Sequence, residues 1–333
     1  MKAARIHRYG GNEQVVLEEI PRPVAGPGDL LVQVRAASVN PVDFKTRDGK
    51  LKTLLRYPLP LTLGNDLSGT VVETGPGVTR FAAGDEVFAR LDKDRIGTFA
   101  QFALVREGAA AKKPSGLSHI EAASIPLVGL TAWQALIELG HVQRGQRVLI
   151  HAGAGGVGSF AIQLAKHLGA HVAATASAKN LGLLKTLGAD QPIDYRAQEF
   201  DQVAGEVDFV LDTQGNGTLL RSLAITRPGG RVVSIAAAPT AKFARAWGLN
   251  PFLVFALGVM SRKETRLARR RGVGYDFLFM HASGEQLGQI GALLEAGVIK
   301  PLVDKTWPLA QVKEALAFSE SGHATGKVVL TVE

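Results

Sequence analysis

The chain of 333 residues contains no cysteine. Without thiols it cannot form a disulfide, use a thiolate nucleophile or build a zinc site that includes cysteine. Its first residues lack the apolar core of a secretory signal. The longest apolar run, Pro251–Met260, is only about half of a membrane span. We therefore expect a cytoplasmic protein.

Acidic residues are the scarcer charge, with 30 Asp and Glu against 38 Lys and Arg and a net charge of +8. Part of the basic excess lies in residues 262–271, which hold six arginines and lysines. Such a balance favours anionic ligands, including a phosphorylated cofactor. For the run itself, a solvated helix face is the expectation, and contact with nucleic acid or a membrane surface is the alternative.

The most informative motif is a glycine cluster that follows an apolar run. Val148–Ile150 predict a buried strand, Gly153, Gly155 and Gly158 fit G-x-G-x-x-G, and residues 160–168 have helical spacing. A strand, a glycine turn and a helix start form the pyrophosphate site of a dinucleotide-binding fold. We expect Gly153 to permit the turn, Gly155 to admit the phosphates and Gly158 to let helix and strand pack.

The pattern along the chain predicts two domains. The first 120 residues or so are β-rich and punctuated by proline and glycine, and strands then alternate with helices. We predict strands at 147–152, 171–175, near 193, 207–212, 231–235 and 275–280. Alternation of this kind predicts an α/β fold with a doubly wound parallel sheet. The predicted domains are a dinucleotide-binding domain at 124–282, inserted into a β-rich domain formed by 1–123 and 283–333.

The residues after the second predicted strand favour NADPH. An NAD-preferring site places Asp or Glu there, on the ribose 2′-hydroxyl, but this chain reads Ser177-Ala178-Lys179-Asn180. A lysine attracts a 2′-phosphate that a carboxylate would repel. Tyr195, after the third strand, is a further candidate to cover this phosphate. The alternatives are a solvated Lys179 and a surface Tyr195.

The chain resembles the medium-chain dehydrogenase/reductase superfamily, in its zinc-free quinone oxidoreductase and enone reductase branch. The matching segments span nearly the whole chain: residues 37–45, 63–77, 84–88, 122–132, the glycine motif, 187–195 and 326–330. The resemblance implies a GroES-like catalytic domain beside a Rossmann-type domain. It also implies a homodimer through the last strand of the cofactor domain.

The resemblance implies a cofactor site without a metal. Zinc alcohol dehydrogenases carry cysteine at the position of Asn40 and Gly-His-Glu at the position of Gly64-Asn65-Asp66, so we expect no zinc. The implied cofactor contacts are Lys45, Thr131, Gly153, Gly155, Gly156, Val157, Gly158, Ser177, Ala178, Lys179, Asn180, Tyr195, Ile235, Phe277, Leu278 and Phe279. An arginine that is usual in the C-terminal motif is replaced by His323, which weakens the case for a second cofactor cation there.

The simplest chemistry for such a site is direct hydride transfer from NADPH to an electron-poor carbon. Lys45 is our first candidate to stabilise the developing oxyanion or to hold the ribose, Asn40 to donate to the substrate carbonyl, and Tyr57 to donate a proton. The alternatives are a turn-fixing Asn40 and a packing Tyr57. We expect Asp43 to be a structural partner and His151 a hydrogen-bonded residue at a strand end.

The predicted function is NADPH-dependent, zinc-independent reduction of an activated C=C bond in an α,β-unsaturated carbonyl, or of a quinone in one- or two-electron steps. A low-turnover NADPH sensor or a nucleic-acid-binding protein is the alternative. Residues 247–274 are longer than a simple connection. We expect a helical lid whose apolar face closes over the substrate, with docking to a partner or a membrane surface as the competing hypothesis.

Overall fold

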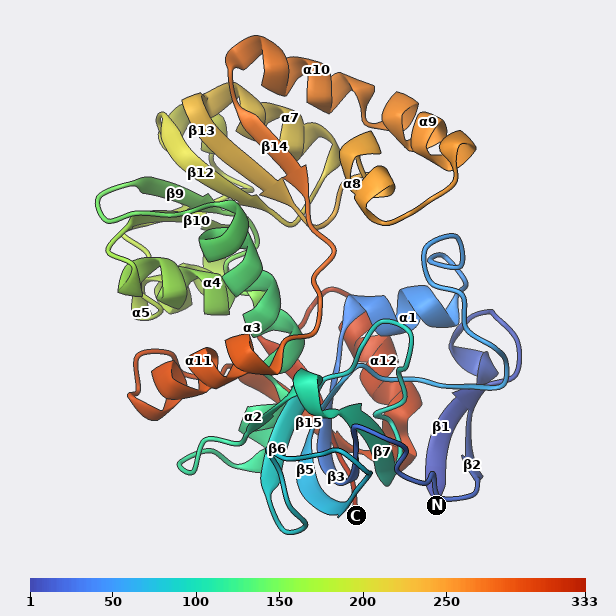
Figure 1. The fold of residues 1–333 in the computed structure, drawn as a ribbon. Coiled ribbons are helices and arrows are strands. Elements are labelled where there is room, and N and C mark those ends of the chain that lie inside the picture. Colours follow the sequence, from blue (N-terminus) through green and yellow to red (C-terminus); the bar gives the residue numbers. More distant parts are fainter. The chain divides into compact units, whose positions relative to one another are not determined.

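The computed structural model describes every residue from Met1 to Glu333, and the chain divides into two compact units. Residues 1–130 and 281–333 form the first unit, and residues 131–280 form the second. The sequence-based domain limits lie after 123 and 282. Figure 1 shows the chain leaving the first unit once and returning to it with its last 53 residues.

The second unit is built on a six-stranded parallel sheet with the order β11-β10-β9-β12-β13-β14. The strands are β9 (Arg147–Ile150), β10 (His171–Ala176), β11 (Gln191–Asp194), β12 (Val207–Asp212), β13 (Thr226–Ser234) and β14 (Gly274–Phe277). The strand order reverses between β9 and β12, as in a doubly wound fold. The predicted fold class is therefore confirmed.

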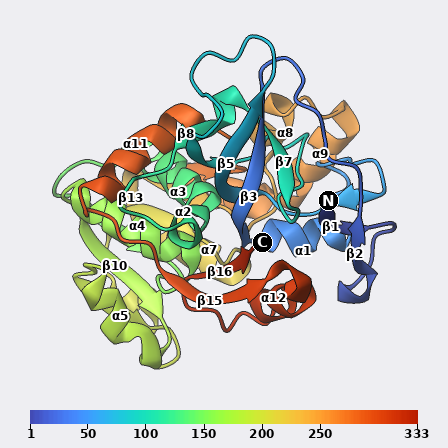
Figure 2. The ribbon, with the colours of Figure 1, turned by 90° about the horizontal axis from the view of Figure 1, so that it is seen from below.

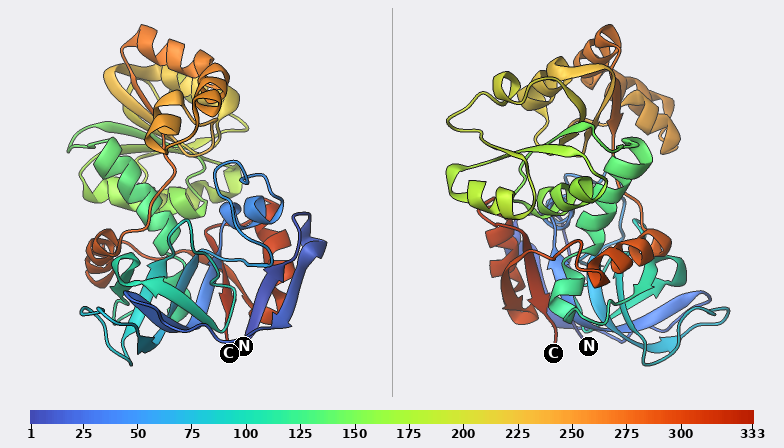
Figure 3. Two further views of the ribbon diagram at one scale, coloured as in Figure 1. Left: turned by 45° about the vertical axis from the view of Figure 1, so that its right-hand side comes forward. Right: turned by 90° about the vertical axis from the view of Figure 1, so that its left-hand side faces the viewer.

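Helices pack against this sheet because its strands carry apolar residues on both faces. The helices of the second unit are α4 (Gly156–His167), α5 (Leu181–Thr186), α6 (Phe200–Val203), α7 (Asn216–Ile225), α8 (Ala241–Ala246), α9 (Pro251–Met260) and α10 (Arg262–Arg271), with the 3-10 turn η4 (Ala178–Asn180), and not all of them touch the sheet. α4 and α5 pack on β9–β11, and α7 and α10 on β12–β14 (Figure 3). Leu149, Val210 and Val232 lie in the core between them.

Three element boundaries in the second unit differ from the sequence-based prediction. Helix α4 begins at Gly156 rather than Phe160, because neither Gly156 nor Gly158 has a positive φ and both adopt helical geometry. Strand β13 begins five residues early, at Thr226 rather than 231. Strand β14 ends at Phe277, so Leu278 and Phe279 continue beyond the sheet.

The first unit contains two antiparallel-rich sheets. The smaller has the order β2-β1-β4, and the larger β15-β16-β3-β5-β6-β8 with β7 paired to β3 (Figure 2). Their strands are β1 (Lys2–Ile6), β2 (Val15–Glu19), β3 (Asp29–Val39), β4 (Leu61–Thr62), β5 (Asp66–Thr74), β6 (Glu86–Arg90), β7 (Phe102–Arg106), β8 (Ala110–Lys112), β15 (Val303–Pro308) and β16 (Lys327–Thr331). β16 pairs antiparallel with β3, so the C-terminal strand lies in the same sheet as the strands of the N-terminal β-rich segment.

The remaining helical elements belong to the first unit, except for the stretch after residue 130, which belongs to the second. They are α1 (Pro41–Arg47), α2 (His119–Ala123), α3 (Pro126–Trp133), α11 (Gly284–Glu295) and α12 (Val312–Glu320), the 3-10 turns η1 (Asn12–Gln14), η2 (Glu107–Ala109) and η5 (Leu309–Gln311), and the π-helical segment η3 (Gln134–Leu139). Ser283 caps α11 by accepting from the Gln286 N–H at 3.2 Å, as its position before the apolar repeat predicts. No helix of the chain combines the length and the apolar character that a membrane crossing needs.

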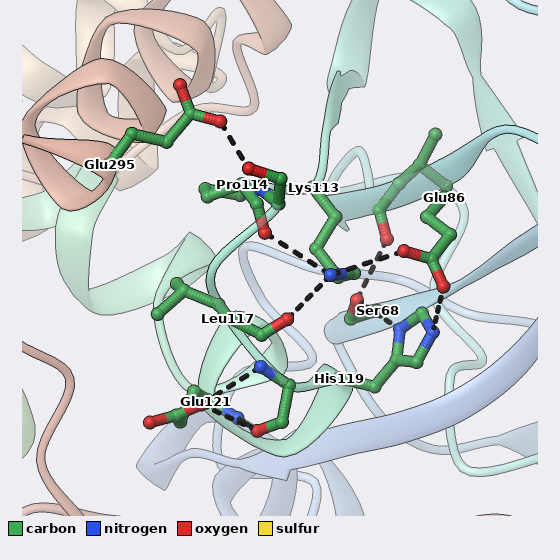
Figure 4. A network of polar contacts seen from close by, with 11 residues as sticks. Ser68, Glu86, Lys113, Pro114, Leu117, His119, Glu121 and Glu295 are labelled. Atoms are coloured by element: carbon green, nitrogen blue, oxygen red, sulfur yellow. Dashed lines mark hydrogen bonds and ion pairs between the residues drawn. The ribbon is translucent and has the colours of Figure 1, made fainter.

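A polar network fixes the connection from β8 to α2 (Figure 4). Lys113 donates to the carbonyls of Pro114 and Leu117 at 3.2 and 2.6 Å and pairs with Glu86 at 3.2 Å. His119 joins Ser68 and Glu86 through its two ring nitrogens, at 2.8 and 3.1 Å. Burial lowers the pKa of His119, so this histidine is a neutral structural link.

Candidate functional site

The carboxyl ends of the six parallel strands carry nearly all the predicted cofactor residues. Gly153 follows β9, Ser177 follows β10, Tyr195 follows β11 and Ile235 follows β13. Because all six strands run in one direction, these residues gather along one edge of the sheet. Ligands of doubly wound folds bind at this edge, beside the point where the strand order reverses.

The glycine turn differs in detail from the sequence-based expectation for Gly153. The residue with positive φ in the turn is Ala152, at 50°, not Gly153. A Cβ on Gly153 would lie 2.8 Å from Leu184 Cδ2 and 2.9 Å from Ile162 Cδ1. Close packing therefore favours glycine at 153, since a larger residue would displace the ends of Leu184 and Ile162, and Gly153 does not supply the positive φ of the turn.

The other two glycines have the geometry that a phosphate site needs. A Cβ on Gly158 would lie 2.3 Å from the Ala152 carbonyl oxygen and 2.7 Å from Gly153 Cα, so only glycine lets α4 approach the turn. A Cβ on Gly155 would meet nothing closer than 3.4 Å, which leaves space beside the helix start. The N–H groups of Gly156, Val157 and Gly158 occupy the first turn of α4, where a helix has no internal acceptor for them.

The ends of β10 and β11 lie side by side and carry cations. Tyr195 donates its backbone N–H to Ala176 at 3.1 Å, which places it next to Ser177. Lys179, on the following turn η4, is exposed and forms no ion pair. The sole carboxylate here, Asp194, accepts from the backbone N–H of Arg196 at 3.0 Å. A positively charged surface with a tyrosine therefore borders the second strand.

Arg196 is a functional candidate that the sequence reasoning missed. Its Nε lies 3.3 Å from the hydroxyl of Tyr195, and its guanidinium carbon lies 5.6 Å from the centre of the tyrosine ring. It forms no ion pair with a carboxylate. The available signal was its position in the sequence, directly after Tyr195.

The last two strands end in an aromatic cluster. Phe277 packs edge-on against Phe243 of α8 at 5.0 Å, and Phe279 packs against Trp247 at 5.2 Å. Ile235 closes β13 by donating its N–H to the Asp212 carbonyl at 3.0 Å. The structure thus brings Ile235 and the Phe277–Phe279 segment to the same strand edge as the glycine turn. Thr131 is buried in α3, at the beginning of the second unit.

His151, directly after β9, is a structural residue, as the sequence suggested. Its ring nitrogens lie 3.2 Å from Thr175 Oγ1 and 2.9 Å from Ser222 Oγ. Burial lowers its pKa to about 4, so the ring is neutral at physiological pH. It has no free nitrogen with which to act as an acid.

In the first unit, Asn40 lies at the centre of a buried polar cluster. Its side chain is 0% exposed, and Nδ2 donates to Asp66 Oδ2 at 2.9 Å and to the Ser38 carbonyl at 3.2 Å. Its Oδ1 accepts from the ammonium of Lys327. Both polar atoms of the amide are therefore engaged within the protein, and neither proton of Nδ2 is available to a substrate carbonyl.

Asp43 and Asn65 extend this cluster to the start of helix α1. The Asp43 carboxylate accepts from the Asn40 N–H at 2.7 Å and from Asn65 Nδ2 at 2.7 Å. Burial raises the pKa of Asp43 to about 7, against the opposing hydrogen bond from Asn65. Asp43 is the structural partner that the sequence predicted, and it anchors the helix that carries Lys45.

Lys327 supplies the positive charge of the cluster. Its ammonium is buried, donates to the Val39 carbonyl at 2.9 Å and reaches Asp66 through the Asn40 amide. Burial lowers the pKa of Lys327 and raises that of Asp66, while each charge opposes the shift of the other. The family motif Gly326-Lys327 was visible in the sequence, but nothing in it indicated this contact.

A zinc ion does not fit this cluster. The positions that supply zinc ligands in related dehydrogenases hold Asn40, Asn65 and Asp66. Asn40 donates to Asp66 and accepts from the Lys327 ammonium, and Asn65 donates to the Asp43 carboxylate. Amide groups are poor zinc ligands, and an ammonium at the centre repels a divalent cation.

Lys45 and Tyr57 differ in their environments. Lys45 lies on α1, is exposed and forms no ion pair. The Tyr57 hydroxyl donates to the Lys93 carbonyl at 2.6 Å, and burial raises its pKa to about 12. Lys45 is therefore free to interact with an anionic group, whereas Tyr57 is a weak acid with its proton already shared.

Comparison with known proteins gives a consistent assignment. The family model described as an alcohol dehydrogenase GroES-like domain matches residues 26–115, and the one described as a zinc-binding dehydrogenase matches 187–330. The mitochondrial NAD(P)H oxidoreductase RTN4IP1 of Bos taurus is 37% identical, over 100% of this chain and 89% of that protein. The 2-methylene-furan-3-one reductase of Solanum lycopersicum is 35% identical, over 99% of this chain and 79% of that protein. The quinone oxidoreductase structure from Coxiella burnetii is 33% identical, with a TM-score of 0.86 over 100% of this chain and 99% of that one.

Proposed function

Since the chain belongs to the medium-chain dehydrogenase/reductase superfamily, in its quinone oxidoreductase and enone reductase branch, we propose that it uses NADPH to reduce the activated C=C bond of an α,β-unsaturated carbonyl. The observation that supports NADPH most directly is the end of β10, where the acidic residue of an NAD-preferring site is absent and unpaired Lys179 follows, with unpaired Arg196 after the neighbouring strand β11. Relatives that act on enones and on quinones share the scaffold, so quinone reduction is the second candidate.

The second unit is the proposed cofactor domain. The N–H groups at the start of α4 would bind the pyrophosphate. Lys179, Arg196 and Tyr195 would contact the 2′-phosphate, and Ser177 with its neighbours Ala178 and Asn180 would shape the pocket around it. The strand ends at Ile235 and Phe277–Phe279 would flank the nicotinamide half of the cofactor, and Thr131 completes the proposed set.

When bound, the nicotinamide would supply a hydride for the β-carbon of the substrate, and negative charge would then develop on the carbonyl oxygen. We assign stabilisation of that charge to Lys45, because its ammonium is exposed and has no carboxylate partner. A positioned charge of this kind contributes roughly 10²–10³-fold to a rate. Solvent is the proposed proton source, because Tyr57 already donates to a backbone carbonyl.

Asn40 has a positioning role in this proposal rather than contact with the substrate. It precedes the first residue of α1, is linked to Lys327 and Asp66, and is held to Asp43 through its backbone N–H. These bonds fix the start of a seven-residue helix that presents Lys45. The metal-free chemistry follows, because the same bonds occupy the positions at which related enzymes hold zinc.

A homodimer through β14 is also proposed. β14 is the last strand of the six-stranded sheet, and its outer edge carries backbone groups that a second copy could pair with.

The test is a panel of a 2-alkenal and a quinone with NADPH and with NADH, with semiquinone detected by electron paramagnetic resonance. Lys179→Gln should raise the KM for NADPH by roughly 10- to 100-fold, since charged hydrogen bonds contribute about 1.5–3 kcal/mol, and leave the KM for NADH unchanged. Lys185→Gln, at an exposed position of α5, is the matched control. Equal losses with both cofactors would contradict the 2′-phosphate assignment, and a quinone turnover far above that of the alkenal would favour the second candidate.

A further inference from the structure

Helix α9 is entirely apolar, and yet none of its residues is buried. Its sequence is PFLVFALGVM, its main neighbours are α8 and α10, and Phe252 and Phe255 are 76% and 71% exposed. Val259 and Met260 are also more than half exposed. A helix that is apolar all round belongs in a protein core or in contact with lipid. The helix is properly formed, since Asn250 caps it by accepting from the Leu253 N–H at 2.9 Å.

The segment around α9 carries most of the net charge of the protein. Residues 237–276 contain eight lysines and arginines and two acids, Glu264 and Asp276, which gives a net charge of +6 against +8 for the whole chain. Six of these cations are exposed and form no ion pair: Arg245, Arg262, Lys263, Arg266, Arg269 and Arg270. Charge of this density without counter-charges attracts an anionic partner.

The cations converge on a groove next to the apolar helix. Lys242 and Arg245 of α8 line it from one side, and Arg262, Arg266 and Arg269 of α10 from the other, around a volume of about 600 Å³. The three α10 residues are spaced i, i+4, i+7 and so share one face, where like charges destabilise the helix unless an anion offsets them. A second groove of about 710 Å³ continues from it along Val254, Phe255 and Val259. The two grooves share Ala241, Arg245, Gly258 and Arg262, so a cationic and an apolar hollow adjoin on the helices α8, α9 and α10, whose ribbons Figure 1 shows.

We propose that α8, α9 and α10 form a docking surface for an anionic lipid bilayer. The apolar residues of α9 would enter the interfacial region while the α10 cations bind the headgroup phosphates, which is how interfacial helices bind. The same face of a second copy does not fit, because it would bring +6 against +6. A nucleic acid would satisfy the cations and leave the aliphatic residues of α9 in water. This proposal does not rest on the proposed reaction.

The test is co-sedimentation of the full-length protein with vesicles of phosphatidylcholine alone, or with about one third phosphatidylglycerol, at low and high salt. We expect salt-sensitive binding to the anionic vesicles only. Arg266→Gln with Arg270→Gln should weaken it about 25-fold, at about fivefold per cation. Phe252→Ser with Phe255→Ser should weaken it about 100-fold, at about tenfold per ring. Lys185→Gln with Lys313→Gln, two exposed lysines elsewhere, is the matched control and should bind as the wild type does.

Three results would overturn the proposal. The first is no wild-type binding to anionic vesicles at low salt. The second is binding of RNA or DNA oligonucleotides that the arginine variant loses and the phenylalanine variant keeps, in a protein that ignores vesicles. The third is a wild type that does not bind vesicles, combined with a raised KM for a soluble enone in the phenylalanine variant. That result would identify the segment as the lid expected from the sequence. A protein without reductase activity that binds vesicles would still support the docking surface.

Discussion

Replacing Lys327 with methionine tests whether the buried cluster of the first unit depends on its internal cation. Methionine preserves the length of the side chain and removes the charge. The variant leaves the Asn40 Oδ1 and the Val39 carbonyl without their ammonium donor and leaves Asp66 without its main counter-charge. Removing one partner from a buried charge cluster costs about 3–5 kcal/mol. At about 2–4 °C per kcal/mol for a unit of this size, the Tm should fall by roughly 6–20 °C.

The pH dependence separates this effect from a simple loss of packing. Burial raises the pKa of Asp66 in the native protein, and Lys327 opposes that rise. Without Lys327 the carboxyl takes up a proton more easily, and a neutral carboxyl needs no counter-charge. The Tm difference between wild type and variant should therefore be larger at pH 8 than at pH 5.5.

The assay is thermal unfolding followed by circular dichroism at the two pH values, with Lys313→Met as the control. Lys313 is exposed on α12 and forms no ion pair, so its variant should change stability by no more than about 0.5 kcal/mol. A Lys327→Met variant that melts within 2 °C or so of the wild type at pH 8, or that is destabilised equally at both pH values, would refute the assignment of Lys327 as the counter-ion.

Four further predictions can be checked on purified variants. Gly158→Ala should weaken NADPH binding at least about tenfold in a fluorescence titration. It should also lower the free energy of unfolding by about 1–3 kcal/mol, because its Cβ would lie 2.3 Å from a carbonyl oxygen. The control Gly182→Ala, whose Cβ would have nothing within 4 Å, should raise the free energy of unfolding by up to about 1 kcal/mol. Tyr57→Phe should change kcat less than about twofold, because its pKa is raised to about 12; a 100-fold loss would restore it as the proton donor. Lys45→Met should lower kcat/KM by about 10²–10³-fold, and an unchanged value would remove it from the site. The folded pKa of Asp43, raised from 3.8 to about 7, means that the native state keeps a proton which the unfolded state has lost. Its contribution to stability is therefore present at low pH and lost as the pH rises from about 4 to 7, which urea unfolding of wild type and Asp43→Asn across this range would show.

Part of the fold could be predicted because its signals are local. The buried run before the glycines, the helix after them and the alternation of strands with helices each depend on neighbours within about ten residues. β12 was predicted with the bounds that the structure has, Val207–Asp212. The acid-free end of the second strand was equally visible, because parallel strands bring their carboxyl ends together whatever the loops between them.

The sequence by itself therefore determined the fold class and the family, and it predicted the edge of the sheet at which we propose that the nucleotide binds. Only the tertiary structure decided that the Asn40 amide is engaged within the protein and does not face a substrate. Lys327 lies 287 positions away in the chain, and no local pattern indicates that its ammonium would donate to this amide. The tertiary structure also decided that Ala152, and not Gly153, has the positive φ of the glycine turn. It decided the exposure of α9 as well. An apolar helix looks alike in sequence whether it is covered or bare, since exposure depends on what packs against it, and here the neighbouring helices leave its rings in solvent.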